Sequence, residues 1–170
     1  KINLRPELGM GKLFDFSKIS EWSSDLLKSG LFNSIDLYGP EVEEGIDNFK
    51  KIYDLAGSLG IKKKAHVGEF SDAKSVKTFI EYFDLDEVQH GITAASDDSV
   101  LQFIKDRNIR LNISPASNIL LGSAKSYEEH PVKKIVEAGI RVSIGTDDLM
   151  FFNKSAQKST FPNQYPHAAL

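Results

Sequence analysis

The chain has 170 residues, with 21 Lys and Arg against 24 Asp and Glu, 41% hydrophobic residues and no cysteine. This length fits one globular domain, and a net charge of -3 gives no clustered basic excess of the kind that nucleic-acid binding needs. Without cysteine, a disulfide framework, a thiolate nucleophile and a Cys-ligated zinc site are excluded, so His, Asp or Glu must hold any metal. Residues 1–9 lack the apolar segment of a secretory signal and no stretch approaches about 18 consecutive apolar residues, so we expect a cytoplasmic protein without membrane contacts.

Short apolar runs alternate with longer segments of helical period, which is typical of repeated βα units around a parallel sheet. In chain order, strands are expected at residues 1–5, 34–37, 64–68, 87–90, 110–113 and 142–146. The helices between them are expected at residues 16–29, 41–59, 73–83, 97–107 and 131–138.

Residues that favour helix ends agree with these boundaries. N-caps are expected at Ser17, Asp72 and Asp97, and glycines in a left-handed conformation are expected just after helices, at Gly30, Gly60 and Gly139. The pattern stops past Phe152, so residues 1–152 are expected to form one domain and residues 153–170 an irregular tail.

Serial βα units build either an open doubly wound sheet or a closed (β/α)₈ barrel. The stretch Gly9-Met10-Gly11-Lys12 is the best candidate for the phosphate loop of a doubly wound sheet, but it lacks both phosphate-loop spacings. We therefore expect an α/β fold of the (β/α)₈ TIM-barrel type. About six βα units fit into 170 residues, whereas a full barrel typically needs about 250 residues, so this barrel is expected to be incomplete.

Polar residues follow the last expected strand. Ile140, Val142 and Ile144 alternate with Arg141, Ser143 and Gly145, and the side that carries Ser143 continues to Asp147. Asp147 should therefore point into the barrel mouth, and Asp148 follows it directly. One of the two could instead cap the next helix, but adjacent carboxylates repel each other and need a cation or hydrogen-bond donors nearby.

Two earlier strands end in histidine. His66 precedes Gly68 and Glu69, and a sharp turn at the glycine would let Glu69 face the same mouth as His66. An imidazole there suits a metal ligand, and a carboxyl beside it suits proton transfer. His90 ends the next strand and is again followed by glycine. One such histidine alone is more often structural, but two on consecutive strands favour a functional site.

Three further features carry weaker expectations. His130 precedes Pro131 and is expected to cap or pack against a helix, and His167 in the tail is expected to have no role. For residues 114–118, simple turn formation and ligand contact remain equally open.

Taken together, these residues resemble the adenosine deaminase family of the metal-dependent amidohydrolase superfamily. The motifs that carry the resemblance are Ile35-Asp36-Leu37-Tyr38-Gly39-Pro40-Glu41, Ala65-His66-Val67-Gly68-Glu69, His90-Gly91, Ser114-Pro115-Ala116-Ser117-Asn118, His130-Pro131 and Thr146-Asp147-Asp148. The resemblance implies a (β/α)₈ barrel that binds one zinc ion. It also implies hydrolysis of adenosine or a similar aminopurine to the 6-oxo product, with release of ammonia.

The resemblance also implies residue roles. It makes His66 and Asp147 zinc ligands and Glu69 the proton donor to the purine ring nitrogen. It makes His90 the residue that takes a proton from the zinc-bound water and orients it.

Two further residues are implied to contact the purine. Asp148 would hydrogen-bond the five-membered ring, and the backbone N–H of Gly39 would contact another ring nitrogen. The partner is therefore expected to be a small-molecule purine. We favour the nucleoside, with adenine, AMP and modified nucleosides left open.

One departure from the family pattern matters most. The family's zinc site has two further ligands in a His-x-His pair at the end of the first barrel strand, and this sequence contains no His-x-His. Residues 2–5 look like the third strand of the family barrel, so we expect the first two strands to be missing and the fragment alone to be inactive. The alternative is a non-catalytic purine-binding remnant. In either case, sheet edges at residues 2–5 and 142–146 would favour self-association.

Overall fold

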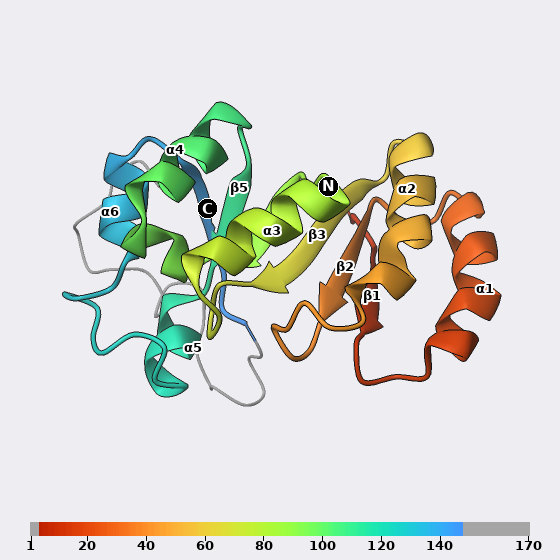
Figure 1. The fold of residues 1–170 in the computed structure, drawn as a ribbon, viewed down its shortest axis with the longest axis horizontal. Coiled ribbons are helices and arrows are strands. Elements are labelled where there is room, and N and C mark those ends of the chain that lie inside the picture. The colour runs from red at the N-terminus through yellow and green to blue at the C-terminus, as the bar shows by residue number, and fades with distance from the viewer. Residues whose placement is uncertain (1–3, 148–170) are drawn as a thin grey trace.

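The computed structural model describes residues 4–147, in which six parallel strands form a single sheet (Figure 1). Every strand pairs with the next one along the chain, so the strand order in space is the order in sequence. The strands are β1 (Glu7–Gly11), β2 (Ser34–Tyr38), β3 (Lys62–Val67), β4 (Glu87–His90), β5 (Arg110–Ile113) and β6 (Arg141–Ile144). A doubly wound sheet reverses its strand order at a switch point, whereas a barrel adds each strand on the same side. The fold is therefore that of an incomplete (β/α)₈ barrel.

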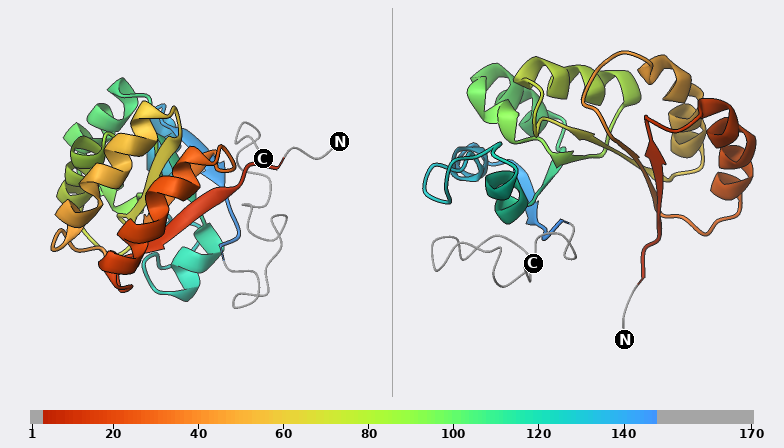
Figure 2. Two further views of the ribbon diagram at one scale, coloured as in Figure 1. Left: turned by 90° about the vertical axis from the view of Figure 1, so that its right-hand side faces the viewer. Right: turned by 90° about the horizontal axis from the view of Figure 1, so that it is seen from below.

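Helices connect the strands and lie around the outside of the curved sheet (Figure 2). They are α1 (Phe16–Lys28), η1 (Ile46–Phe49), α2 (Lys50–Ser58), α3 (Ala73–Phe83), η2 (Ile92–Ser96), α4 (Asp98–Asp106), α5 (Pro115–Leu120) and α6 (Val132–Glu137). None of the helices among residues 4–147 is both long and apolar enough to cross a membrane.

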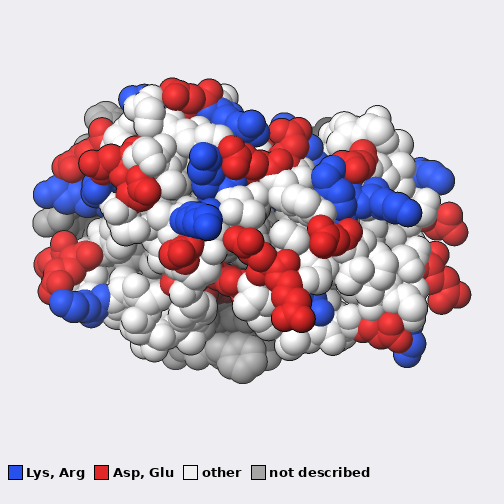
Figure 3. All heavy atoms as spheres, in the orientation of Figure 1, with Lys and Arg blue, Asp and Glu red and all other residues white. Residues whose placement is uncertain are grey.

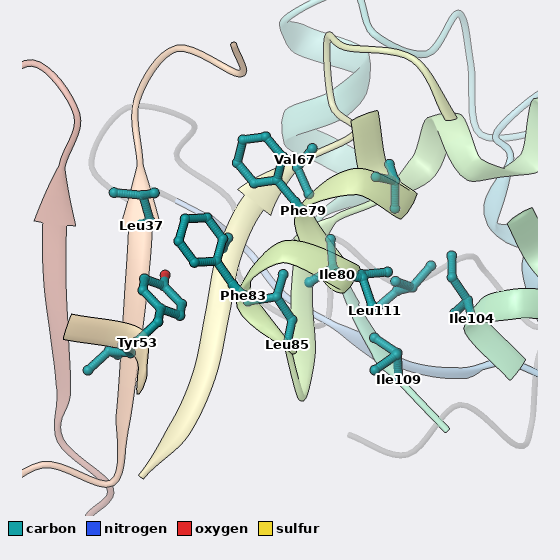
Figure 4. Close-up of a cluster of buried hydrophobic side chains, with 14 of the residues drawn as sticks. Leu37, Tyr53, Val67, Phe79, Ile80, Phe83, Leu85, Ile104, Ile109 and Leu111 are labelled. Carbon is teal, nitrogen blue, oxygen red and sulfur yellow. The ribbon is translucent and has the colours of Figure 1, made fainter. Parts of the chain in front are cut away.

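The hydrophobic core lies between the sheet and its helices. Alternate strand residues such as Leu37, Val67 and Leu111 are fully buried there, against Phe79 and Phe83 of α3 (Figure 4). Burying a side chain of this size stabilises the fold by about 2 kcal/mol relative to leaving it exposed. These contacts determine which side chains point outward to the helices, and the alternate side chains of each strand therefore point to the inner face.

The inner face of the sheet is polar. Glu7 accepts a hydrogen bond from Ser34, and Lys64 Nζ lies 2.9 Å from Glu7 Oε2 and 3.5 Å from Glu87 Oε2. Asn112 donates to Glu87 at 3.0 Å and accepts from Ser143. These contacts run from β1 across to β6, so the strands present charged and polar groups to the barrel interior.

The first strand lies later in the chain than expected. β1 spans Glu7–Gly11; of the strand expected at residues 1–5, residues 4 and 5 are not in a strand and residues 1–3 lie outside the described residues. Glycine usually weakens a strand, but β1 contains Gly9 and Gly11. A Cβ at Gly11 would lie 2.7 Å from the Phe14 ring, and one at Gly9 would lie 3.1 Å from Tyr38. The glycines therefore make room for two aromatic rings on the inner face.

The remaining elements follow the expected pattern with local corrections. The strands at 87–90 and 110–113 and the helix at 73–83 are confirmed to the residue, and Gly30, Gly60 and Gly139 have positive φ. The helix expected at 41–59 begins only at η1, because the chain turns at Gly45 with φ of 77°. Asp72 and Asp97 cap helices as expected.

One expected N-cap is wrong, and one short helix was not expected. The N-cap of α1 is Asp15 rather than Ser17, and its carboxylate accepts from Ser17 N at 2.9 Å. Residues 115–120 form the short helix α5, with Pro115 in its first turn, where the missing N–H costs nothing. The expected domain end at Phe152 and the tail at 153–170 lie outside the described residues.

Candidate active site

The expected site residues gather at the carboxyl ends of the strands. Because all six strands are parallel, these ends meet at one edge of the sheet. A cavity of about 220 Å³ lies there, lined by His66, Gln89, His90, Asn112, Ser114, Ser143, Gly145 and Asp147. The alternation expected in β6 is confirmed, because Ser143, Gly145 and Asp147 all line this cavity.

Glu69, His90 and Asp147 form a cluster with metal-ligand chemistry. One ligand atom from each lies within 4.8 Å of the other two, with Glu69 and His90 buried and Asp147 exposed. Ser117 donates a hydrogen bond of 2.6 Å to Asp147 Oδ2. His90 and Asp147 have positive φ, at 67° and 56°, a backbone conformation that costs free energy outside glycine and often marks functional sites.

His66 lies beside this cluster rather than in it. Its ring centre is 5.4 Å from that of His90, and its Nδ1 is 2.9 Å from Asp36 Oδ2. The other carboxylate oxygen, Asp36 Oδ1, is buried without a hydrogen-bond partner. Burial lowers the pKa of His66, but the close polar contact with Asp36 and the negative charges of Asp36, Asp147 and Glu69 outweigh burial and raise the pKa overall.

The turn at Gly68 brings Glu69 to the cluster. Gly68 has φ of 80°, and a Cβ there would lie 2.4 Å from Val76 Cγ2 and 2.9 Å from Gly91 Cα. Only glycine fits this turn, which places Glu69 Oε1 within 3.5 Å of His90 Nδ1. The turn expected from the sequence is therefore confirmed.

Asn118 connects the two buried groups of the cluster. Its Nδ2 donates to Glu69 Oε1 at 2.7 Å and lies 3.2 Å from His90 Nδ1. Its Oδ1 lies 3.3 Å from His130 Nε2. His130 Nδ1 accepts from Val132 N at 3.0 Å, so the buried His130 contacts the start of α6, in agreement with the expectation that it caps or packs against a helix. The start of α6 thus supports Asn118, and Asn118 holds the side chains of Glu69 and His90.

Burial shifts the pKa values of Glu69 and His90 in opposite directions. Desolvation raises the pKa of Glu69 to about 7; the hydrogen bond from Asn118 opposes this shift, and the charges of Asp147 and Glu41 add to it. Desolvation, with the neighbouring His66 charge, lowers the pKa of His90 to about 4. A carboxyl that is half protonated near neutral pH beside a neutral imidazole can serve as a general acid.

Comparison with known proteins identifies the group to which the chain belongs. A family model described as adenosine deaminase matches residues 15–168. The chain belongs to the adenosine deaminase family. A Treponema pallidum protein assigned as an adenosine/adenine deaminase is 50% identical over 160 residues, which cover 94% of this chain and 54% of that protein.

Solved structures agree on the fold of this adenosine deaminase family member. The crystal structure of an adenine deaminase from Arthrobacter aurescens matches with a TM-score of 0.79 at 22% identity, covering 88% of this chain and 46% of the other. A zinc-bound amidohydrolase from Burkhoderia ambifaria matches with a TM-score of 0.74 at 20% identity, covering 91% and 44%. The chain therefore spans about half the length of each of these three proteins.

The donor set of the site fits a zinc ion. Imidazole nitrogens and carboxylate oxygens are ligands that zinc accepts, and ligand atoms of Glu69, His90 and Asp147 lie within 4.8 Å of one another. The close cluster contains Asp147 of the expected ligand pair, together with Glu69 and His90, while His66 adjoins it. Among the described residues, Glu69, His90 and Asp147 form the group whose ligand atoms could hold one metal ion, and His66 lies beside it.

Of the two residues expected to contact the purine, Gly39 lies within the described residues and Asp148 does not. Gly39 is exposed just after β2, with φ of 111°, and Asp148 lies outside the described residues. Four neighbours received no individual role from the sequence: Asp36, Glu41, Ser117 and Asn118. Asp36 and Glu41 flank Gly39 in a motif that the resemblance already used, and Ser117 and Asn118 belong to the stretch left open between turn and ligand contact.

Proposed function

We propose that the protein carrying this chain is a zinc-dependent aminopurine deaminase. The observation that supports this proposal most is the buried Glu69, whose pKa rises to about 7 beside His90 and Asp147. A purine C6 becomes electrophilic enough for attack by water only when a ring nitrogen is protonated. A carboxyl that holds a proton near neutral pH can supply that proton.

The reaction is a hydrolysis. Water adds to C6 of the aminopurine, the C6–N bond breaks, and the products are the 6-oxo purine and ammonia. In this proposal, Glu69 donates a proton to the ring nitrogen next to C6. His90 takes a proton from the attacking water and orients it.

His66 and Asp147 are the proposed zinc ligands in this chain. Bound zinc would supply Lewis-acid activation of water near neutral pH. Asp36 sits against His66 Nδ1 and orients its imidazole, an arrangement typical of metal-binding histidines. Ser117 restrains Asp147 through the 2.6 Å hydrogen bond to its carboxylate.

The proposed substrate is a small aminopurine, and we favour adenosine. Gly39 and Asp148 are the proposed contacts to the purine ring. The adenosine/adenine description of the Treponema pallidum relative supports this substrate class without deciding between nucleoside and free base.

A zinc-loaded absorbance assay tests the proposal. Because this sequence has no His-x-His pair, the assay uses a longer form of the protein that also contains a strand ending in that pair. Adenosine absorbance should fall as the 6-oxo product forms, with one zinc ion bound per chain. Full zinc loading without turnover of adenosine, adenine or AMP would contradict the proposal, and tight purine binding in that case would favour a binding protein.

A further inference from the structure

The carboxylate of Glu41 holds the loop that carries Glu69. Gly68 N donates to Glu41 Oε2 at 2.7 Å, Glu69 N to Oε1 at 3.0 Å, and Phe70 N to Oε2 at 3.3 Å. Ser71 donates twice to Oε2, from its backbone N at 2.9 Å and from its hydroxyl at 2.6 Å. Four consecutive backbone N–H groups and one hydroxyl therefore converge on one side chain from a different loop.

These contacts require an ionised carboxylate. Burial raises the pKa of Glu41, but the hydrogen bonds from Ser71, Glu69 and Gly68 outweigh burial and lower it below its ordinary value. A glutamine at this position would offer a single oxygen acceptor and would turn an NH₂ group toward backbone donors. The cluster of N–H groups would then lose part of its hydrogen bonding, although the side chain would keep its size.

Glu41 is itself held in place from the other side. Lys12 Nζ donates to Pro40 O at 2.8 Å and to Val42 O at 2.9 Å, the carbonyls of the two residues that flank Glu41. Lys12 follows β1, Glu41 follows β2, and Glu69 follows β3. The contacts therefore link three consecutive strand ends in a fixed order and end at the backbone of Glu69.

We propose that Glu41 is a positioning residue, which fixes the backbone of Glu69 so that its carboxyl meets the substrate ring. This inference rests on the proposed deaminase function. Glu41 contacts the loop at residues 68–71 and no reacting atom, and its negative charge also adds to the raised pKa of Glu69. Asn118 hydrogen-bonds the side chain of Glu69, whereas Glu41 hydrogen-bonds its backbone N–H, so the two contacts restrain different parts of the residue.

Glu41→Gln in the longer, zinc-loaded protein tests the inference, with Glu44→Gln as the matched control. Glu44 lies on the same loop, and it is exposed. Glu41→Gln should lower kcat by roughly 100-fold, with KM within about twofold of wild type, because misplacement of a catalytic group by about 1 Å costs that much. Zinc content should stay at one per chain, and Glu44→Gln should match wild type. An unchanged kcat in Glu41→Gln would overturn the inference.

Amide hydrogen exchange separates this inference from the proposed function. In Glu41→Gln, the amides of residues 68–71 should exchange faster than in wild type, while those of β4 and β5 should not change. If wild type proves inactive, the deaminase proposal fails, and unchanged exchange at residues 68–71 would then overturn the role of Glu41 separately. If Glu41→Gln unfolds, Ser71→Ala decides: it removes a donor to Glu41 and an acceptor for Gly68 N, so the amides of Glu69 and Phe70, which donate to Glu41 and not to Ser71, should exchange faster and kcat should fall with zinc retained.

Discussion

Burial determines the protonation of Glu69, and protonation determines when it can act as an acid. With a pKa of about 7, the carboxyl is mostly protonated below pH 7 and loses its proton as the pH rises. The deaminase kcat/KM should therefore fall about tenfold per pH unit above that value. Steady-state assays from pH 6 to pH 9 measure this limb, and a flat profile would contradict the assignment.

Glu69→Gln removes the proton donor while keeping the size of the side chain. Turnover should fall by roughly 100- to 10,000-fold, the range for loss of a general acid. Metal analysis should still find bound zinc, because Glu69 is not one of the proposed zinc ligands. Retained turnover in Glu69→Gln, compared with Glu44→Gln as a control, would rule out the proton-donor role.

His130 couples the stability of the chain to pH. Desolvation lowers its folded-state pKa to about 4. An unfolded chain, in which histidine titrates near 6.5, therefore binds more protons than the folded chain between pH 6.5 and pH 4. Protonation would also break the hydrogen bond from Val132 N to Nδ1. The contribution of His130 to stability is thus complete above about pH 6.5 and is lost as the pH falls toward 4.

Urea unfolding of wild type and His130→Gln at pH 7 and pH 5 checks this coupling. The variant should lose less stability than wild type between the two pH values, because it has no imidazole to protonate. Comparing the loss within each protein controls for the change in packing. Equal losses in the two proteins would contradict a neutral, buried His130.

Among the elements, the turn after β3 has the strictest steric requirement. Gly68→Ala adds a Cβ that meets Val76 and Gly91 and forces alanine into positive φ. Gly30 has a similar φ of 72°, but a Cβ there meets nothing within 4 Å. We expect Gly30→Ala to cost about 1–2 kcal/mol of unfolding free energy and Gly68→Ala about 3–5 kcal/mol, as measured by urea unfolding. Equal costs would show that the close packing around Gly68 is not restrictive.

Elements with clear periodicity could be predicted from the sequence, and others could not. β4, β5 and α3 were predicted to the residue, because buried and polar positions alternate or recur there with a regular period. β1 was missed because Gly9 and Gly11 leave space for the rings of Tyr38 and Phe14, and this packing is a tertiary contact that the local sequence does not show. The α5 helix was missed because Ser114-Pro115 also fits a turn.

The candidate site could be predicted in part. Strand-end positions and glycines indicated His66, Glu69, His90 and Asp147, because parallel strands bring their carboxyl ends together. The support by Glu41 and Asn118 depends on contacts across 27 and 49 residues of sequence, which no local pattern shows. Long-range hydrogen bonds of this kind require the structure.

At the scale of the whole molecule, the surface and the sheet edges differ in character. Positive and negative side chains are interspersed over the face shown in Figure 3, in agreement with the small net charge of -3. Within residues 4–147, β1 and β6 each pair with a strand on one side only and form the two edges of the sheet. The N-terminal edge was expected at residues 2–5, and the structure places it at β1.

We propose that these edges make the chain self-associate. Unpaired strand edges present backbone donors and acceptors that another strand can bind. Sedimentation velocity on this chain should show a weight-average mass that rises with concentration. A longer form with a closed barrel has no unpaired strand edges, so its mass should not rise in this way. A monomer of 18.9 kDa at every concentration would contradict the proposal.

Oxygen-isotope labelling of the product tests the central claim most directly. The longer, zinc-loaded protein is incubated with adenosine in H₂¹⁸O, and the purine product and ammonia are quantified. Hydrolytic deamination predicts a 6-oxo product that carries one solvent oxygen and forms in an amount equal to that of ammonia. Glu69→Gln should form neither product at a comparable rate. Absence of ammonia, or a 6-oxo product without the solvent label, would contradict the account.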